Sequence, residues 1–262
     1  MMKNSALNYY LVVLILSLIA GNSFAKTIQV SNNHDAGMGS FRYALHLASN
    51  DSSIDEIRFI ISANLELKSS VTYTGIQSLA IYGAGIMLDG EQIETGDMFS
   101  STSSAPLVLD NISFQNSRGN GVVIKVPGNT SNNVSLSLNQ VNITNTADYG
   151  VYIDDSEVQK SNRPKGSKAG IILYIRNSHF KNNTISDKYK NGIRVDEHNS
   201  GGIYADISNS VIETNDEDGI KLNEDGDGDV ILSMKNTLVN GKVSSSFISV
   251  QASNQGDTAY KM

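Results

Sequence analysis

The sequence predicts an all-β chain whose short strands wind into coils that stack on one another in parallel. Three observations predict this fold. A ten-residue strand pattern repeats five times, a second short strand follows each repeat, and a corner residue recurs inside each repeat. Every segment alternates apolar and polar residues with a period of two, which is typical of strands with one buried face.

The repeats are irregular in spacing but constant in pattern. They are LVLDNISFQN from Leu107, LSLNQVNITN from Leu136, LYIRNSHFKN from Leu173, ADISNSVIET from Ala205 and LSMKNTLVNG from Leu232. The second strands are GVVIKV from Gly121, GVYIDD from Gly150, GIRVDE from Gly192, GIKLNE from Gly219 and FISVQA from Phe247. One apolar column, Phe114, Ile143, Phe180, Ile212 and Val239, recurs at intervals of 29, 37, 32 and 27 residues. This spacing predicts a fixed cross-section with loops of varying length.

The corner residue falls three positions before that column. It is Asn111, Gln140, Asn177, Asn209 or Asn236. Asparagine tolerates the left-handed backbone of a tight bend, and stacked amides can hydrogen-bond from one coil to the next. We therefore expect coils of about 25 to 35 residues, with strands of successive coils about 4.8 Å apart.

This strand–Asn–strand–Gly–strand pattern, from about residue 79 to residue 252, resembles the right-handed parallel β-helix of the pectin-lyase-like superfamily. The resemblance implies a single-stranded right-handed parallel β-helix and indicates almost nothing about activity. The run DAGMGSFRYALHLASN resembles the turn and helix that open many exported bacterial β-helix proteins. We expect a helix from Ser40 to Ala48 to cap the first coil, within a cap segment of residues 26–78 ahead of the coils of 79–262. No comparable cap is evident at the carboxyl-terminal end, where a loop or a partner would cover the edge.

Composition limits the functional classes. The 262 residues include 20 Lys and Arg against 27 Asp and Glu, with no Cys and no Trp. This excludes a disulfide scaffold, a Cys-ligated metal site and a basic nucleic-acid binder. The apolar run from Leu11 to Ala20, followed by Ser23 and Ala25, predicts a signal peptide over residues 1–25, with no membrane span after cleavage. We therefore expect an exported chain that is periplasmic, on the cell surface or extracellular.

The second strands predict a polar face. Their outward positions are Tyr152 and Asp154, Arg194 and Asp196, and Lys221 and Asn223, with Lys125 before them. Just past the strand ends come Asp155, Glu197 and Glu224, with His198 beside Glu197. Stacking would bring neighbouring carboxylates to about 5 Å, where they repel one another unless a cation or base lies between them. Ca²⁺ is one such cation.

The resemblance implies one possible chemistry for this face. β-Helix polysaccharide lyases use Ca²⁺ to neutralise a uronate and an Arg to abstract its α-proton. By analogy, Arg194 would be the catalytic base and Asp154, Asp196 and Glu197 the Ca²⁺ ligands. The alternative is a solvated face on which Arg194 and Lys221 pair with Asp154 and Asp196, each pair contributing about 0–1 kcal/mol.

These patterns favour a non-catalytic module that binds a polysaccharide or has a structural role at a surface. Its ligand-binding residues would be Tyr152, Asp154, Arg194, Asp196, Lys221 and Asn223. A Ca²⁺-dependent lyase acting on acidic polysaccharide is the first alternative. An adhesin or assembly subunit that self-associates at its carboxyl-terminal edge is the second.

Overall fold

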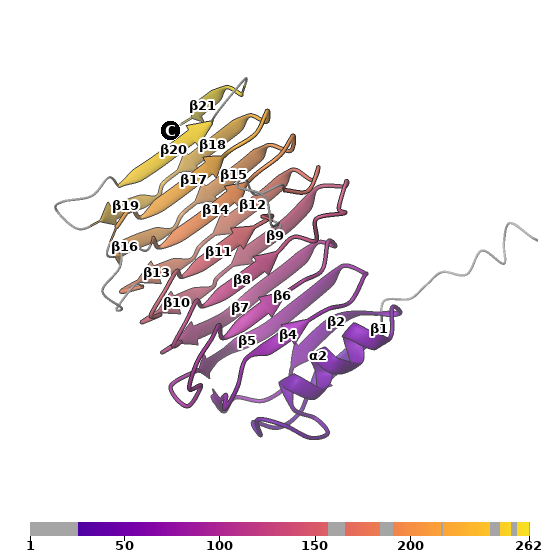
Figure 1. The fold of residues 1–262 in the computed structure, drawn as a ribbon. Helices are drawn as coiled ribbons and strands as arrows, with labels where there is room; N and C mark the ends of the chain where they lie inside the picture. Colours follow the sequence, from indigo (N-terminus) through magenta and orange to yellow (C-terminus); the bar gives the residue numbers. More distant parts are fainter. Residues whose placement is uncertain are drawn as a thin grey trace, which may run out of the picture.

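A computed structural model describes residues 26–156, 166–183, 191–215, 217–241, 247–252 and 256–261. The chain forms a parallel β-helix of about seven coils, with one short helix near its amino-terminal end (Figure 1). The predicted signal peptide, residues 1–25, lies outside the described residues. No helix in the described ranges is long and apolar enough to cross a membrane.

One sheet, which we call sheet B, has seven strands, one from each coil. From the amino-terminal end these are β4 (Val71–Tyr73), β6 (Phe99–Ser101), β8 (Val122–Lys125), β11 (Val151–Asp154), β14 (Ile193–Glu197), β17 (Ile220–Glu224) and β20 (Ile248–Ala252). Neighbouring strands pair in parallel and, from β8 to β20, in unbroken register. Residues of different coils are therefore vertical neighbours.

Sheet A has 14 strands and turns a corner in each coil. The long strands β5 (Leu79–Asp89) and β7 (Leu107–Gln115) run through the corner. Later coils divide the same path into β9 (Val134–Asn139) and β10 (Asn142–Thr144), β12 (Ile171–Arg176) and β13 (His179–Lys181), β15 (Ile203–Ser208) and β16 (Val211–Asn215), and β18 (Val230–Lys235) and β19 (Leu238–Gly241). The sheet ends at β19 and at β21 (Thr258–Lys261), and it begins with β1 (Lys26–Val30), β2 (Ile54–Phe59) and β3 (Leu65–Glu66).

The predicted corner residues stand at these corners. Asn111, Gln140, Asn177, Asn209 and Asn236 all have φ between 50° and 54°, in the left-handed region. The Nδ2 of Asn236 donates to the Oδ1 of Asn209 at 3.2 Å, as expected for stacked amides. A second series, Asn116, Asn145 and Asn182, also has positive φ values and was not predicted. The sequence therefore located one corner of the coil and missed the other.

The predicted core column is continuous. Phe114 pairs in register with Ile143, Ile143 with Phe180, and Phe180 with Ile212, which in turn pairs with Val239. The first four side chains are fully buried. Val239, in the last coil, is only partly buried. The stacking of the predicted repeats is thus confirmed, and the column loses its cover at one end.

The cap helix is confirmed as α2 (Phe41–Asn50). The hydroxyl of Ser40 accepts from the backbone N–H of Tyr43 at 3.2 Å, which satisfies an otherwise unpaired donor of the first turn. The predicted apolar face of Phe41, Ala44, Leu45 and Ala48 is buried against the first coils. Within that face, the Phe41 ring packs 5.1 Å from that of Phe59 and 6.5 Å from that of Phe99. The helix therefore closes the core at its amino-terminal end.

Candidate ligand-binding face on sheet B

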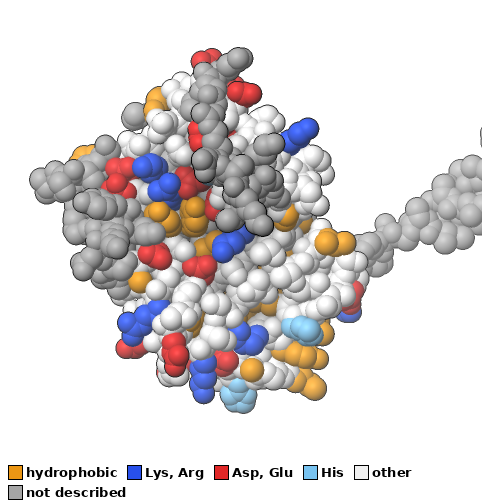
Figure 2. Space-filling view, viewed as in Figure 1, with side chains coloured by type: hydrophobic (Ala, Val, Ile, Leu, Met, Phe, Trp, Pro, Cys, Tyr) orange, Lys and Arg blue, Asp and Glu red, His pale blue; other side chains and the backbone are white. Residues whose placement is uncertain are grey.

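The predicted face forms a block of residues in register. Tyr152 pairs with Arg194 and Arg194 with Lys221. One step along the strands, Asp154 pairs with Asp196 and Asp196 with Asn223. The structure therefore brings together the six residues predicted to bind ligand. Lysine, arginine and acidic side chains are interspersed over the side of the molecule shown in Figure 2.

Arg194 is the centre of the block. Its Nε donates to the Oδ2 of Asp196 at 2.7 Å, and its Nη1 donates to the Tyr149 hydroxyl at 3.2 Å. Burial alone would lower the pKa of Arg194, but the hydrogen bond and charge of Asp196 outweigh it and raise the pKa above its usual range. The guanidinium is therefore held charged and oriented, which suits a binding group and does not suit a general base.

Two tyrosines form the apolar part of the block. The rings of Tyr149 and Tyr152 lie 5.0 Å apart, and the Arg194 guanidinium carbon lies 5.6 Å from the centre of the Tyr149 ring. Burial and the nearby charges of Asp154 and Asp196 raise the pKa of Tyr152 well above its usual range. The Tyr152 hydroxyl consequently stays neutral and can donate a hydrogen bond. Tyr149 was missed because it precedes the strand, outside the alternating pattern used to predict the face.

The predicted residues lie on the outer face of the sheet, but they are more covered than the alternation indicated. Asp196 is only 3% exposed and Tyr152 and Arg194 are half-buried. The cause is local, since Arg194 and Tyr152 both contact the Asp196 carboxylate. Two further members, Lys221 and Asn223, are half-buried on the next strand. The face offers partly covered side chains in fixed orientations, and not a fully solvated row of ion pairs.

The predicted Ca²⁺ ligands are divided between two sides of the sheet. Asp154 and Asp196 point outward, whereas Glu197, the last residue of β14, takes the inward step of the alternation and is fully buried. The backbone N–H groups of Asn199 and Gly201 donate to the Glu197 carboxylate. Across the ranges that the structure describes, no three acidic or histidine side chains are close enough together to hold a metal ion.

Glu197 belongs to a buried acidic column with Asp155 and Glu224. The Asp155 Oδ2 accepts from the backbone N–H of Ser167 at 3.0 Å, and Glu197 pairs in register with Glu224. Burial raises the pKa of Asp155 to about 6. Burial and the adjacent Glu224 raise that of Glu197 to about 9, and burial raises that of Glu224. The column therefore holds protons at neutral pH, because stacked buried carboxylates cannot all ionise together.

His198 lies at the rim of the face. Its Nε2 is 4.0 Å from the Asp154 Oδ1, and its Nδ1 is 3.9 Å from the Asp225 Oδ2. The imidazole thus stands between carboxylates of the coils on either side of its own. The sequence placed His198 beside Glu197, but Asp225 became its neighbour only through the stacking of the turns, in which Asp225 N donates to Glu197 O at 2.8 Å.

Sheet A carries a second aromatic group that the sequence did not single out. The rings of Tyr174 and Tyr204 lie 6.0 Å apart, and the Arg176 guanidinium carbon lies 5.7 Å from the Tyr174 ring centre. Arg176 also donates to Asp206 at 2.9 Å. Tyr174 and Arg176 were outward positions of one predicted repeat, used only as evidence of a strand, and Tyr204 comes directly before the next repeat. This group matches the sheet B block in residue types and provides an internal control for it.

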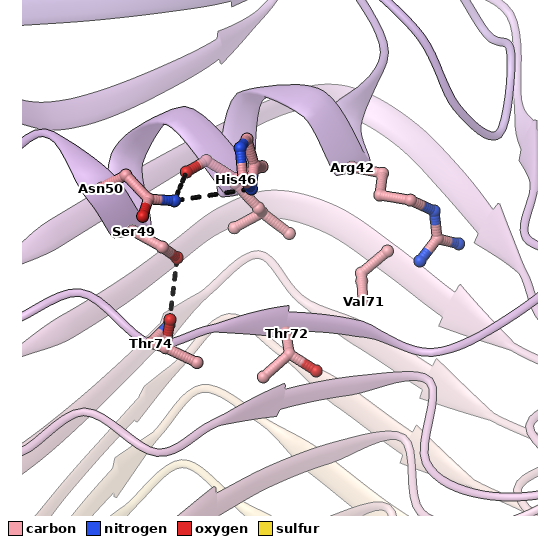
Figure 3. A pocket seen from close by; sticks show the side chains of 8 residues that line it. Arg42, His46, Ser49, Asn50, Val71, Thr72 and Thr74 are labelled. Atoms are coloured by element: carbon pink, nitrogen blue, oxygen red, sulfur yellow. Dashed lines mark hydrogen bonds between the residues drawn. The ribbon is translucent and has the colours of Figure 1, made fainter.

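Two cavities elsewhere lack a reactive arrangement among their described side chains. One of about 170 Å³ lies between α2 and β4 (Figure 3). Its Arg42 donates to Asp35 and to the carbonyls of Ser69 and Ser70, and its Asn50 bonds the carbonyl of His46. These groups secure the cap. A shallower hollow of about 530 Å³ near residues 76–78, 104–106 and 129–133 is lined by uncharged residues.

Comparison with models of known protein families finds no match for this chain, and comparison with curated protein sequences finds none either. The fold and the geometry of the face are therefore the whole basis for a functional proposal.

Proposed function

We propose that this chain is an exported, non-catalytic module that binds a polysaccharide through the outer face of sheet B. The observation that carries the proposal is the partly exposed Tyr152 ring, which packs against the buried Tyr149 beside a guanidinium fixed by Asp196. Aromatic rings present apolar surfaces on which the faces of sugar rings stack, and charged planar donors form strong, directional hydrogen bonds with hydroxyl and carboxylate oxygens. The combination favours a sugar chain over a small apolar ligand.

The register also places polar side chains at a regular spacing, which suits a polymeric ligand. Tyr152, Arg194 and Lys221 follow one another at the spacing of parallel strands, about 4.8 Å per coil. A chain lying along the stack would meet a hydrogen-bonding side chain at each coil. Two cationic side chains in that row favour a polysaccharide that carries carboxylates, such as a polyuronate, because charge-assisted hydrogen bonds are stronger than neutral ones.

The state of Arg194 supports binding over lyase chemistry. A base that abstracts an α-proton must first be neutral, and the raised pKa of Arg194 opposes this. Glu197 also lies on the opposite side of the strand from Asp154 and Asp196, so the three residues do not form one Ca²⁺ site. The Ca²⁺-dependent lyase therefore stays the second candidate, supported by the Arg194–Asp196 pair alone.

The test is a binding titration of the purified chain with polygalacturonate and with a neutral glucan, with and without Ca²⁺. We expect polygalacturonate to bind, and the Arg194→Ala variant to lose at least tenfold in affinity. The matched control is Arg176→Ala, which removes an equivalent Asp-paired, Tyr-associated arginine from sheet A. Equal losses in both variants, or no binding of either polymer, would overturn the proposal. A product absorbing in the near ultraviolet would instead identify a lyase.

A further inference from the structure

At the carboxyl-terminal end of the coil stack, the described residues leave the core only partly covered. Along one column of sheet B, Ile193 and Ile220 are fully buried, whereas Ile248, the next in register, is only partly buried. Along a column of sheet A, Leu232 is 2% exposed and its neighbour Tyr260 is 52% exposed. A cavity of about 150 Å³ opens here among Leu232, Met234, Ile248, Tyr260 and Lys261.

Both sheets end here in an open edge. β20 is the last strand of sheet B, β21 and β19 are the last strands of sheet A, and no strand in the described ranges pairs with their outer edges (Figure 1). Natural edge strands are usually protected by charged residues, proline or bulges. β20, with the sequence ISVQA, has no charged residue and no proline, and its pairing with β17 runs in register throughout. The only charged residue of β21 is Lys261.

We propose that this end is an interface with a second copy of the same chain, related by a two-fold axis perpendicular to the coil stack. This axis sets β20 antiparallel to β20 of the second copy, and β21 to β21. A two-fold contact requires a self-complementary surface. An uncharged β20 meets that requirement, since centring the pairing on Val250 puts no like charges opposite each other.

The pairing also suits β21 and the apolar side chains. Centring β21 on Tyr260 sets Lys261 opposite Ala259 of the second copy, so the two lysines stay apart. Val250 and Tyr260 of each copy would then face the same residues of the other, and Ile248 would face Ala252. Each open core thus supplies the layer that the other lacks, at the spacing of paired strands. This interface is independent of the proposed glycan-binding face.

The absence of cysteine from the sequence makes a direct test possible. In the proposed register, position 250 faces itself across the two-fold axis, at a Cα separation of about 4.5–5.5 Å, which lies within the range that a disulfide spans. We expect the Val250→Cys variant to form a covalent dimer as its main species under mild oxidation. The matched control is Ser249→Cys, on the same strand but facing outward and opposite Gln251, which should stay largely monomeric on a non-reducing gel.

Sedimentation velocity on the unmodified chain completes the test. We expect a dimer whose fraction rises with concentration, and Val250→Lys, which sets two ammonium groups opposite each other, should abolish it. Ser249→Lys should leave the dimer intact, which separates repulsion at the interface from general damage to the last coil. A monomer at every concentration, or equal cross-linking of the two cysteine variants, would overturn the proposal. Open-ended oligomers larger than a dimer would also contradict it.

Discussion

The two ends of the coil stack differ in how far their hydrophobic core is covered. At the amino-terminal end, α2 lies across the first coils and its Phe41 is fully buried between the rings of Phe59 and Phe99. At the other end, Ile248 and Val250 are only partly buried, and no described helix covers them. In a repeat fold each coil is buried by its neighbours, so a terminal coil needs a separate covering element. The described residues include one such element, at the amino-terminal end, and the proposed dimer would supply the other.

The largest expected effect is loss of the amino-terminal cover. Phe41→Ala removes a fully buried ring from the contact between α2 and the first coils, and we expect it to lower the free energy of unfolding by about 3–5 kcal/mol. Urea titration followed by circular dichroism measures this loss. The control is Tyr43→Ala, on the same helix but 36% exposed, which should change stability by about 0.5 kcal/mol or less. Similar effects of the two variants would contradict a sealing role for Phe41.

A matched isoleucine pair sharpens the comparison within one column. Ile220→Ala, in a fully buried layer, should cost about 2–5 kcal/mol, because it leaves a cavity that its neighbours cannot fill. Ile248→Ala removes the same atoms one coil later, where burial is partial, and should cost about 1 kcal/mol or less at concentrations at which the chain is monomeric. Thermal unfolding of both variants measures the two losses of stability. Equal losses would mean that the last coil is as well covered as the one before it.

The middle of the stack differs from both ends because it buries carboxylates. The folded state raises the pKa of Glu197 to about 9 from an ordinary value of 4.5, so between these values the folded state keeps a proton that the unfolded state releases. The stability contributed by this proton is present in full below about pH 4.5 and is lost as the pH rises towards 9. The raised pKa values of Asp155 and Glu224 act in the same direction.

Glu197→Gln tests this titration. The amide is neutral at every pH. The melting temperature of the variant should therefore fall less steeply between pH 5 and pH 9 than that of the unmodified chain. Glu56→Gln, on β2, is the control, because the hydrogen bond with Arg58 lowers the pKa of Glu56 below its usual range. Parallel pH profiles for the unmodified chain and Glu197→Gln would contradict a shared proton in the column.

The smallest expected effect concerns the corner asparagines. Asn209→Ala should cost about 1–2 kcal/mol, since a residue with a Cβ other than Asn or Asp is strained at φ 50°. Asn209→Gly, which removes that strain, should recover part of the loss, and the part not recovered measures the amide contact with Asn236. Chemical denaturation of both variants separates the two contributions. No difference between them would assign the whole effect to side-chain contacts.

The sequence predicted most of the fold because a repeat reveals its own stacking. Alternation located the strands, and the recurring position from Phe114 to Val239 identified the column that the structure shows. The sequence could not reveal the depth of burial. Alternation placed Asp196 on the outer face, but the contacts with Arg194 and Tyr152 that bury it depend on side-chain packing between coils. The hydrogen bond between Arg194 and Tyr149 joins residues that are 45 apart in the sequence, so no local pattern could predict it.

Hydrogen exchange compared between the two ends, at low and high protein concentration, tests the central claim most directly. We expect the amides of β2 and β5 to be strongly protected at both concentrations, because α2 seals that end. The amides of β20 and β21 should exchange quickly in dilute solution and become protected as the concentration rises. Strong protection of β20 and β21 in dilute solution, or equal exchange at both ends, would contradict the account.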